Sequence, residues 1–340
     1  ESVSSAIYNS GFFMPIKKIV INLAPADVKK EGSLFDLAIA VGILQAGGYI
    51  GNEDYSNYVI VGELSLDGKL RPINGMLPLL ISAKEQGYSK FIIPKKNEAE
   101  ACYLNGVEAY AFDDLAEVVS FLKRERQVSP VVPRIWEKEE RSYQEDLSRV
   151  KGQFKAKRAL EIAVAGGHNI MLVGAPGSGK TMLAKCVPSI LPDLTFDEAL
   201  EITKIHSIAG VLDKEQGVVT SRPYRSPHHS ATPVALTGGG KNAKPGEISL
   251  AHNGVLFLDE MPEFSKSLLE TLRQPLEDGN ITVSRASLTV QYPANFMLIA
   301  SMNPCPCGNF GSKTLECKCS PSQIDKYLKK LSGQIGRAHV

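Results

Sequence analysis

One eight-residue stretch constrains this chain more than any other. Gly174-Ala175-Pro176-Gly177-Ser178-Gly179-Lys180-Thr181 fits the phosphate-binding pattern G-x-x-x-x-G-K-[ST] at every fixed position. The apolar residues 170–173 precede it and a helix-compatible segment, 182–187, follows it, as the pattern requires. Such a loop turns backbone N–H groups toward the phosphates of a nucleotide. The motif therefore predicts a nucleoside triphosphate site, with Lys180 at the β- and γ-phosphates and the Thr181 hydroxyl on Mg²⁺.

Two carboxylates follow a second apolar segment. Residues 255–258 are an uninterrupted apolar run, typical of a buried parallel strand, and Asp259 and Glu260 come directly after it. At the end of such a strand we expect Asp259 to hold Mg²⁺ and Glu260 to orient or deprotonate the attacking water. A third apolar run, 296–301, leads to Asn303, which can hydrogen-bond the γ-phosphate or the water. The alternative for Asn303 is a simple turn, because Pro304 follows it.

The order of apolar segments predicts two units of α/β class. A chain of 340 residues is long enough for two domains. Residues 1–128 mix strand candidates with helix candidates and contain no phosphate loop. The strand candidates are 17–23 and 58–64; the helix candidates are 2–8, 34–44 with Ser33 as its N-cap, 77–83 and 116–122. Residues 129–142 are a predicted linker rich in proline, and 143–333 alternate strands and helices as in a doubly wound parallel sheet.

Composition narrows the function classes. The net charge is +1, so no overall field favours nucleic acid or an anionic membrane. The chain has no run of 18 apolar residues and no signal-like start, so we expect a cytoplasmic protein without a membrane partner. Both ends look like those of a gene fragment. Residues 334–340 resemble a non-native tail, and we assign them no function.

Four of the six cysteines gather near the end of the chain. Cys305, Cys307, Cys317 and Cys319 form two C-x-C pairs, and four thiolates can hold Zn²⁺ tetrahedrally. The spacing is tighter than the usual C-x-x-C, and the alternative is a set of reduced cytosolic thiols. A zinc ion here would fix the loop that follows Asn303. The other two, Cys102 and Cys186, are expected in the core.

A basic stretch lies between Gln216 and Gly246, where no Asp or Glu occurs. It contains several glycines and six basic or imidazole side chains: Arg222, Arg225, His228, His229, Lys241 and Lys244. As a mobile loop it would contact nucleic-acid phosphates. The other interpretation is an insert that packs on its own unit, and the sequence leaves both open. A metal site at the two histidines is disfavoured because no cysteine or carboxylate lies near them in sequence.

The order of these motifs resembles an AAA+ ATPase of the magnesium-chelatase-like branch, and within it the ComM/YifB competence family. The resemblance rests on residues 224–232 (YRSPHHSAT), 245–254 (PGEISLAHNG) and 302–308 (MNPCPCG). It implies that Asp259 and Glu260 are the Walker B pair and Asn303 the sensor-1 residue. Lys180, Glu260 and Asn303 would then be catalytic, with ATP and Mg²⁺ as cofactors.

The same resemblance implies a partner and a quaternary state. The family is similar to hexameric ring motors, and its competence branch implies a branch-migration helicase that acts on DNA. Two alternatives stay open: a metal-chelatase-type motor subunit, or a regulatory module that uses ATP as an assembly switch. The arginine finger and second sensor of the family would follow the helix near 331–333, so no residue here is assigned to them.

For the first unit, the resemblance implies a fold like the proteolytic domain of Lon proteases. Such a site needs a serine nucleophile and a lysine that activates it. Leu34 and Leu77 occupy the corresponding positions, and neither side chain can attack or accept a proton. We therefore expect a non-proteolytic scaffold or interaction domain.

Overall fold

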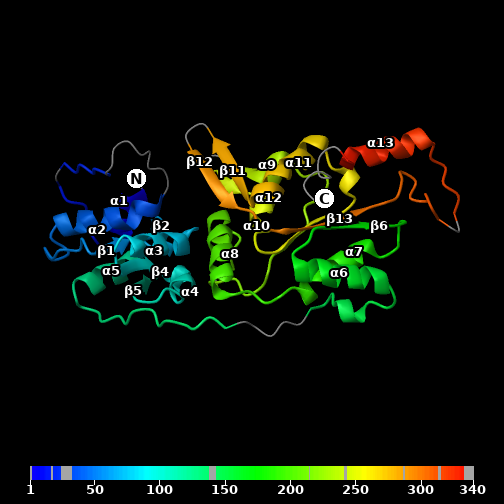
Figure 1. Cartoon of the computed structure of the whole chain (residues 1–340). Helices are drawn as coiled ribbons and strands as arrows, with labels where there is room; N and C mark the ends of the chain where they lie inside the picture. Colours follow the sequence, from blue (N-terminus) through cyan, green and yellow to red (C-terminus); the bar gives the residue numbers. More distant parts are fainter. Residues whose placement is uncertain are drawn as a thin grey trace. The chain divides into compact units, whose positions relative to one another are not determined.

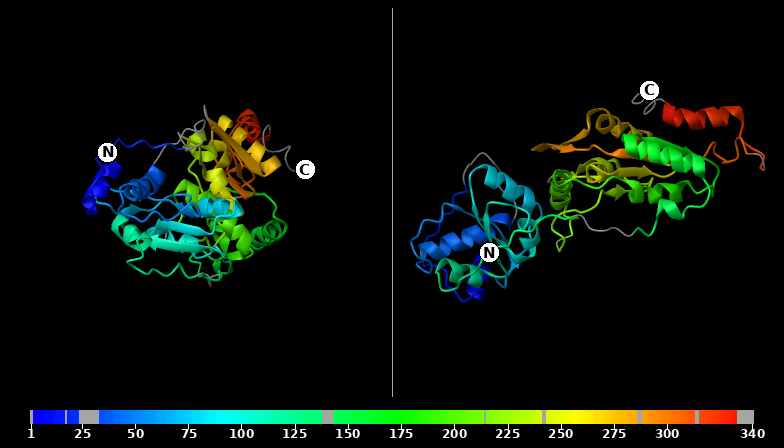
Figure 2. Two further views of the ribbon diagram at one scale, coloured as in Figure 1. Left: turned by 90° about the vertical axis from the view of Figure 1, so that its left-hand side faces the viewer. Right: turned by 60° about the horizontal axis from the view of Figure 1, so that its bottom comes forward.

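The computed structural model describes residues 2–16, 18–23, 33–137, 143–213, 215–240, 243–285, 288–312 and 315–332. Contacts divide the chain into two units, Glu1–Trp136 with Gly210–Val218 and Glu137–Ala209 with Val219–Val340. Each is built on a parallel sheet with helices, so the predicted α/β class is confirmed (Figures 1 and 2). Among the described helices, none is long and apolar enough to cross a membrane.

A three-stranded parallel sheet forms the centre of the first unit. Its order is β1 (Tyr58–Ile60), β4 (Lys90–Pro94), β5 (Glu108–Phe112). Alternate residues of the middle strand face different cores: Ile92 joins one apolar cluster, and Phe91 and Ile93 join another. The other elements are α1 (Ser2–Asn9), η1 (Ser33–Phe35), α2 (Asp36–Ala46), β2 (Glu63–Leu64), β3 (Leu70–Arg71), α3 (Met76–Glu85), η2 (Lys95–Asn97), α4 (Glu98–Ala101) and α5 (Leu115–Leu122).

Three expectations for this unit are wrong in detail. Residues 18–23 form no strand, since no described strand pairs with them and Val20 is 78% exposed; residue 17 lies outside the described chain. The 58–64 segment breaks into β1 and β2 because the backbone of Gly62 bonds residues 34 and 37 instead. Ser33 does not cap a helix: it opens η1, and its hydroxyl donates to Glu63 Oε2 at 2.5 Å.

The second unit contains a four-stranded parallel sheet. Its order is β6 (Ile170–Val173), β13 (Met297–Met302), β10 (Val255–Leu258), β7 (Tyr224–Arg225). Every residue of β10 and β13 is buried, and alternate side chains enter two apolar clusters, one on each face. This two-sided burial explains why both strands read as continuous apolar runs.

Helices and shorter elements surround that sheet. In Figure 1, α6 and α7 lie together on one side of it and α11 and α12 on the other. Besides α6 (Phe154–Gly166) and α7 (Lys180–Cys186), the elements up to β10 are η3 (Leu147–Arg149), η4 (Val187–Ile190), α8 (Phe196–Ala209), α9 (Pro233–Thr237), β8 (Gly238–Gly239), β9 (Lys244–Pro245) and α10 (Glu247–Leu250). After β10 come η5 (Met261–Glu263), α11 (Lys266–Thr271), α12 (Arg273–Asp278), the hairpin β11 (Asn280–Arg285) and β12 (Leu288–Pro293), and, after β13, α13 (Pro321–Ser332).

The basic stretch is largely folded onto its own unit. The Arg222 guanidinium bonds both carboxylate oxygens of Glu198 at 3.0 and 2.9 Å, and its side chain is only 12% exposed. Arg225 makes a similar fork to Glu247 at 2.6 and 2.7 Å. These two arginines are therefore held in ion pairs and do not form a free basic surface. Residues 238–239 pair with 244–245 as a small hairpin, and position 241 lies outside the described chain.

A buried histidine ties three parts of this unit together. His252, which is 5% exposed, follows α10. Its Nε2–H donates to Glu201 of α8 at 3.1 Å, and its Nδ1 accepts the backbone N–H of Asn295 at 3.1 Å. Burial lowers the pKa of His252 despite the opposing effect of the Glu201 carboxylate. The ring is therefore neutral at pH 7, as its acceptor role at Nδ1 requires.

The lowered pKa of His252 predicts that the second unit becomes less stable in acid. Because its pKa is lower folded than unfolded, the unfolded chain takes up the proton first, and stability falls as the pH drops below about 6.5. Urea denaturation from pH 7.5 to 5.5 measures this loss. In His252→Asn the amide oxygen can accept from Asn295 without titrating, so the decline should be shallower; the exposed His168→Asn variant is the control. Identical pH profiles for both variants would contradict this role.

Candidate nucleotide site

The phosphate loop joins β6 to α7, which begins at Lys180. Gly177 and Gly179 have φ of +75° and +88°, a left-handed conformation that side chains rarely adopt. Gln153, at the start of α6, donates from Nε2 to the Ser178 carbonyl at 3.2 Å and so supports the loop from outside. Gly179, a fixed glycine of the motif, thus stands where the backbone geometry requires glycine.

The lysine of the motif hydrogen-bonds a residue at the end of β13, the strand next to β6. Lys180 Nζ donates to the carbonyls of Gly174 and Ala175 at 2.8 and 3.0 Å and to Asn303 Oδ1 at 3.1 Å. Asn303 follows β13, the immediate neighbour of β6. The two side chains are 123 residues apart in sequence, yet they meet at the carboxyl edge of the sheet.

A hydroxyl and a carboxylate meet beside this lysine. Thr181 Oγ1 donates to Asp259 Oδ2 at 2.9 Å. The other carboxylate oxygen accepts a hydrogen bond from Ser301 Oγ, in β13. Hydroxyl and carboxylate oxygens are the ligands that Mg²⁺ takes in proteins, so Thr181 and Asp259 suit that ion.

Glu260, the second carboxylate of the pair, lines a cavity beside these contacts. Its backbone is left-handed, with φ of +51°, and its N–H donates to Ser301 Oγ at 3.1 Å. The residue is exposed and lines a cavity of about 740 Å³ together with Asn303, Lys326 and Tyr327. A carboxylate that faces open space next to Asn303 can reach a water molecule there.

Two contributions to the site were missed in the sequence. Ser301 bonds both residues of the carboxylate pair; its signal was a polar side chain inside a buried apolar strand, two residues before Asn303. Helix α13 also packs on the site: Lys330 Nζ donates to the Pro262 carbonyl at 3.1 Å, and Tyr327 lines the same cavity as Asn303. No spacing rule predicts that packing.

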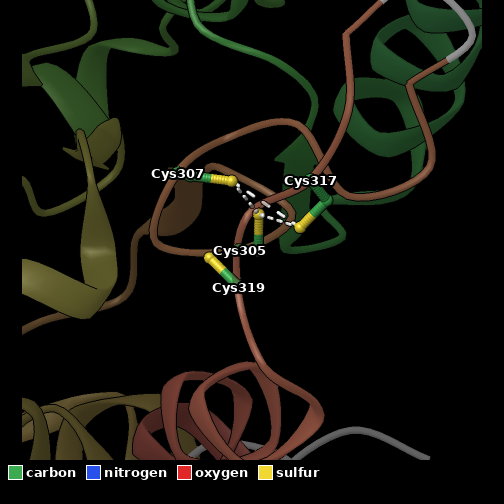
Figure 3. A group of neighbouring side chains, drawn as sticks. All are labelled: Cys305, Cys307, Cys317 and Cys319. Atoms are coloured by element: carbon green, nitrogen blue, oxygen red, sulfur yellow. Dashed lines mark hydrogen bonds between the residues drawn. The ribbon is translucent and has the colours of Figure 1, made fainter.

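The four clustered cysteines meet just beyond Asn303. Their sulfur atoms all lie within 4.8 Å of one another, and Figure 3 shows the sulfurs of Cys305, Cys307 and Cys317 facing one another with that of Cys319 beside them. Cys305 is fully buried, and the other three are partly exposed. This is the only such group of potential metal ligands among the described residues. Cys102 and Cys186 are buried elsewhere, as predicted. His228 and His229 are exposed and belong to no such group in the described chain.

Sequence comparisons place the chain in a family. The profile described as "Magnesium chelatase, subunit ChlI" matches residues 146–337, and that described as "Subunit ChlI of Mg-chelatase" matches residues 1–97. The chain belongs to the magnesium chelatase subunit ChlI family. This confirms the resemblance drawn from the motifs, and the family is one of AAA+ ATPases that use ATP and Mg²⁺.

Individual relatives narrow the position within the family. The chain is 46% identical over 333 residues to the uncharacterized protein YifB of Escherichia coli (strain K12) and 43% identical over 339 residues to competence protein ComM of Haemophilus influenzae. Each match covers 98% of this chain and 65% of the relative, so the chain spans about two thirds of their length. Magnesium-chelatase subunit ChlI of Olisthodiscus luteus is 27% identical over 174 residues, which is 46% of this chain and 50% of that protein.

The two hydrogen bonds of Ser301 predict a measurable role. Ser301→Ala leaves one Asp259 oxygen and the Glu260 N–H without this partner, so the half-saturating Mg²⁺ concentration for nucleotide binding should rise about tenfold. Titration of a fluorescent ATP analogue with Mg²⁺ measures this shift. Ser249→Ala is the matched control, because this fully buried serine has no hydrogen-bond partner for its hydroxyl within the described chain. Equal shifts in both variants would refute the assignment.

Proposed function

We propose that this chain binds and hydrolyses ATP as part of an AAA+ ring motor that acts on DNA. One observation carries the hydrolysis: Lys180 with Asn303, Thr181 with Asp259, and the exposed Glu260 meet at the carboxyl edge of one sheet. Each pair joins the phosphate loop to a different strand. A phosphate loop alone would support binding; the added carboxylate and amide support water attack.

In this proposal the residues have separate tasks. The backbone of residues 174–179 cradles the phosphates, and Lys180 offsets the negative charge of the β- and γ-phosphates. Thr181 and Asp259 hold Mg²⁺, which when bound neutralises charge on the phosphate oxygens. Glu260 orients the attacking water and accepts its proton, and Asn303 hydrogen-bonds the γ-phosphate or that water.

Two substitutions separate binding from hydrolysis. Lys180→Ala removes the charge-assisted contact to the phosphates, so ATP affinity should fall on the order of a hundredfold. Glu260→Gln keeps the shape but removes the proton acceptor, so binding should persist while turnover falls by about a hundredfold or more. Binding of a fluorescent ATP analogue and release of phosphate measure the two effects. The reverse pattern, with binding lost only in Glu260→Gln, would refute these roles.

The DNA partner is the finer part of the proposal. A relative named for competence is 43% identical over 98% of this chain, whereas a magnesium-chelatase subunit matches 46% of it at 27% identity. This contrast favours a DNA motor of the ComM type, a branch-migration helicase in the cytoplasm that works as a hexameric ring, over a metal-chelatase motor. The remaining alternative is an ATP-switched assembly module.

Stimulation by DNA distinguishes these functions. The chain extended to the full length of its relatives should hydrolyse ATP faster when branched or single-stranded DNA is added, by roughly tenfold at low salt, and salt should weaken the effect because phosphate contacts release counterions. Phosphate release with Lys180→Ala as the background control measures it. ATP-dependent assembly by light scattering without any response to DNA would support the assembly module and contradict the DNA motor.

A further inference from the structure

We propose that the four cysteines bind one structural zinc ion and that this metal knuckle braces the phosphate loop. The knuckle consists of residues 305–308 and 317–319. It is formed by two segments, one directly after Asn303 and one directly before α13. The nucleotide chemistry proposed above uses neither the cysteines nor a zinc ion, so the inference goes beyond the proposed function.

The geometry of the sulfur atoms fits one tetrahedral ion. Sulfurs about 2.3 Å from a tetrahedral zinc lie about 3.8 Å from one another. Cys305 Sγ lies 3.4 Å from Cys307 Sγ and 3.7 Å from Cys317 Sγ, and Cys307 and Cys317 are 3.6 Å apart. Cys319 completes the group within 4.8 Å (Figure 3).

The surroundings of the sulfurs also suit bound thiolates. The backbone N–H of Phe310 donates to Cys305 Sγ at 3.3 Å, and such N–H contacts orient metal-bound thiolates and stabilise their charge. Four thiolates without a carboxylate or imidazole select zinc or iron over harder ions. A multi-iron cluster spreads its cysteines over two or more irons, and four sulfurs this close favour a single ion.

The knuckle is pressed against the phosphate loop. Gly308 has φ of +82°, and a Cβ added there would lie 2.5 Å from Cδ of Pro176, the third residue of the motif. Glycine is therefore needed both for its backbone conformation and for this close approach. Cys307 and Cys319 also line the cavity that contains Glu260 and Asn303. The knuckle thus forms part of the wall of this cavity and supports one side of the phosphate loop.

Metal analysis tests the ion. The chain purified from zinc-replete cells without chelator should contain one zinc per chain by mass spectrometry, and a mercurial reagent that blocks thiols should release it to a colorimetric zinc indicator. Cys317→Ala should lose the zinc, whereas Cys102→Ala, which removes a buried cysteine of the first unit, should retain it. Zinc-free wild-type protein, or iron with visible absorption in its place, would overturn the zinc site.

Gly308→Ala tests the brace separately from the metal. This variant keeps all four cysteines and should retain one zinc, but its Cβ displaces Pro176, so affinity for a fluorescent ATP analogue should fall about tenfold. Gly311→Ala is the matched control: its φ is +76° in the same loop, but no atom lies within 4 Å of its added Cβ. Equal ATP-analogue affinities of the two variants, each with zinc bound, would refute the proposal that the knuckle braces the phosphate loop. The roles proposed for Lys180 and Glu260 would stand.

Discussion

The parallel pairing of β13 between β6 and β10 is the constraint on which the site depends. Met302 lies opposite Val173 and Ala300 opposite Leu258, so the three strands end within a residue or two of one another. The Gly174 N–H donates to the Met302 carbonyl at 3.3 Å and continues this ladder into the phosphate loop. Hydroxyl, carboxylate, amide and ammonium groups meet only because the strands end together.

The packing of the two middle strands holds this arrangement in place. Every side chain of β10 and β13 is buried, and fully burying an aliphatic side chain contributes about 1.5–3 kcal/mol. Ser301 is the polar exception inside β13, and its hydroxyl bonds Asp259 and the Glu260 N–H. A buried hydroxyl without partners would destabilise the strand, so the site also satisfies a requirement of the core.

The sequence predicted which side chains meet at the carboxyl edge of the sheet better than it predicted what packs around them. Lys180, Thr181, Asp259, Glu260 and Asn303 each stand at a fixed distance from an apolar run, and strand ends in a parallel sheet bring such residues together. The role of Ser301 depends on which face of β13 it occupies, and the packing of α13 depends on contacts between distant segments. Neither feature can be predicted from the spacing of residues along the sequence.

The expectations that the structure does not bear out also depended on contacts between segments distant in the sequence. Residues 18–23 have strand composition, but a strand exists only with a hydrogen-bonded neighbour, and no described strand pairs with them. For the stretch around Arg222 the sequence left a free basic loop and a packed insert both open, because the partner that decides between them, Glu198, lies in α8, 24 residues away. Charge along a sequence gives no information on which charges are neutralised by partners brought close in the fold.

The chain passes between the two units more than once, and this limits how they can be separated by truncation. The chain leaves the second unit after α8, contributes Gly210–Val218 to the first unit, and returns at Val219. There Gly217 packs so closely on Ala99 that an added Cβ would lie 2.2 Å from the Ala99 carbonyl oxygen. Deletion of the first 136 residues would therefore remove the surface on which Gly217 packs. A clean genetic separation must therefore replace Gly210–Val218 as well as remove the first 136 residues.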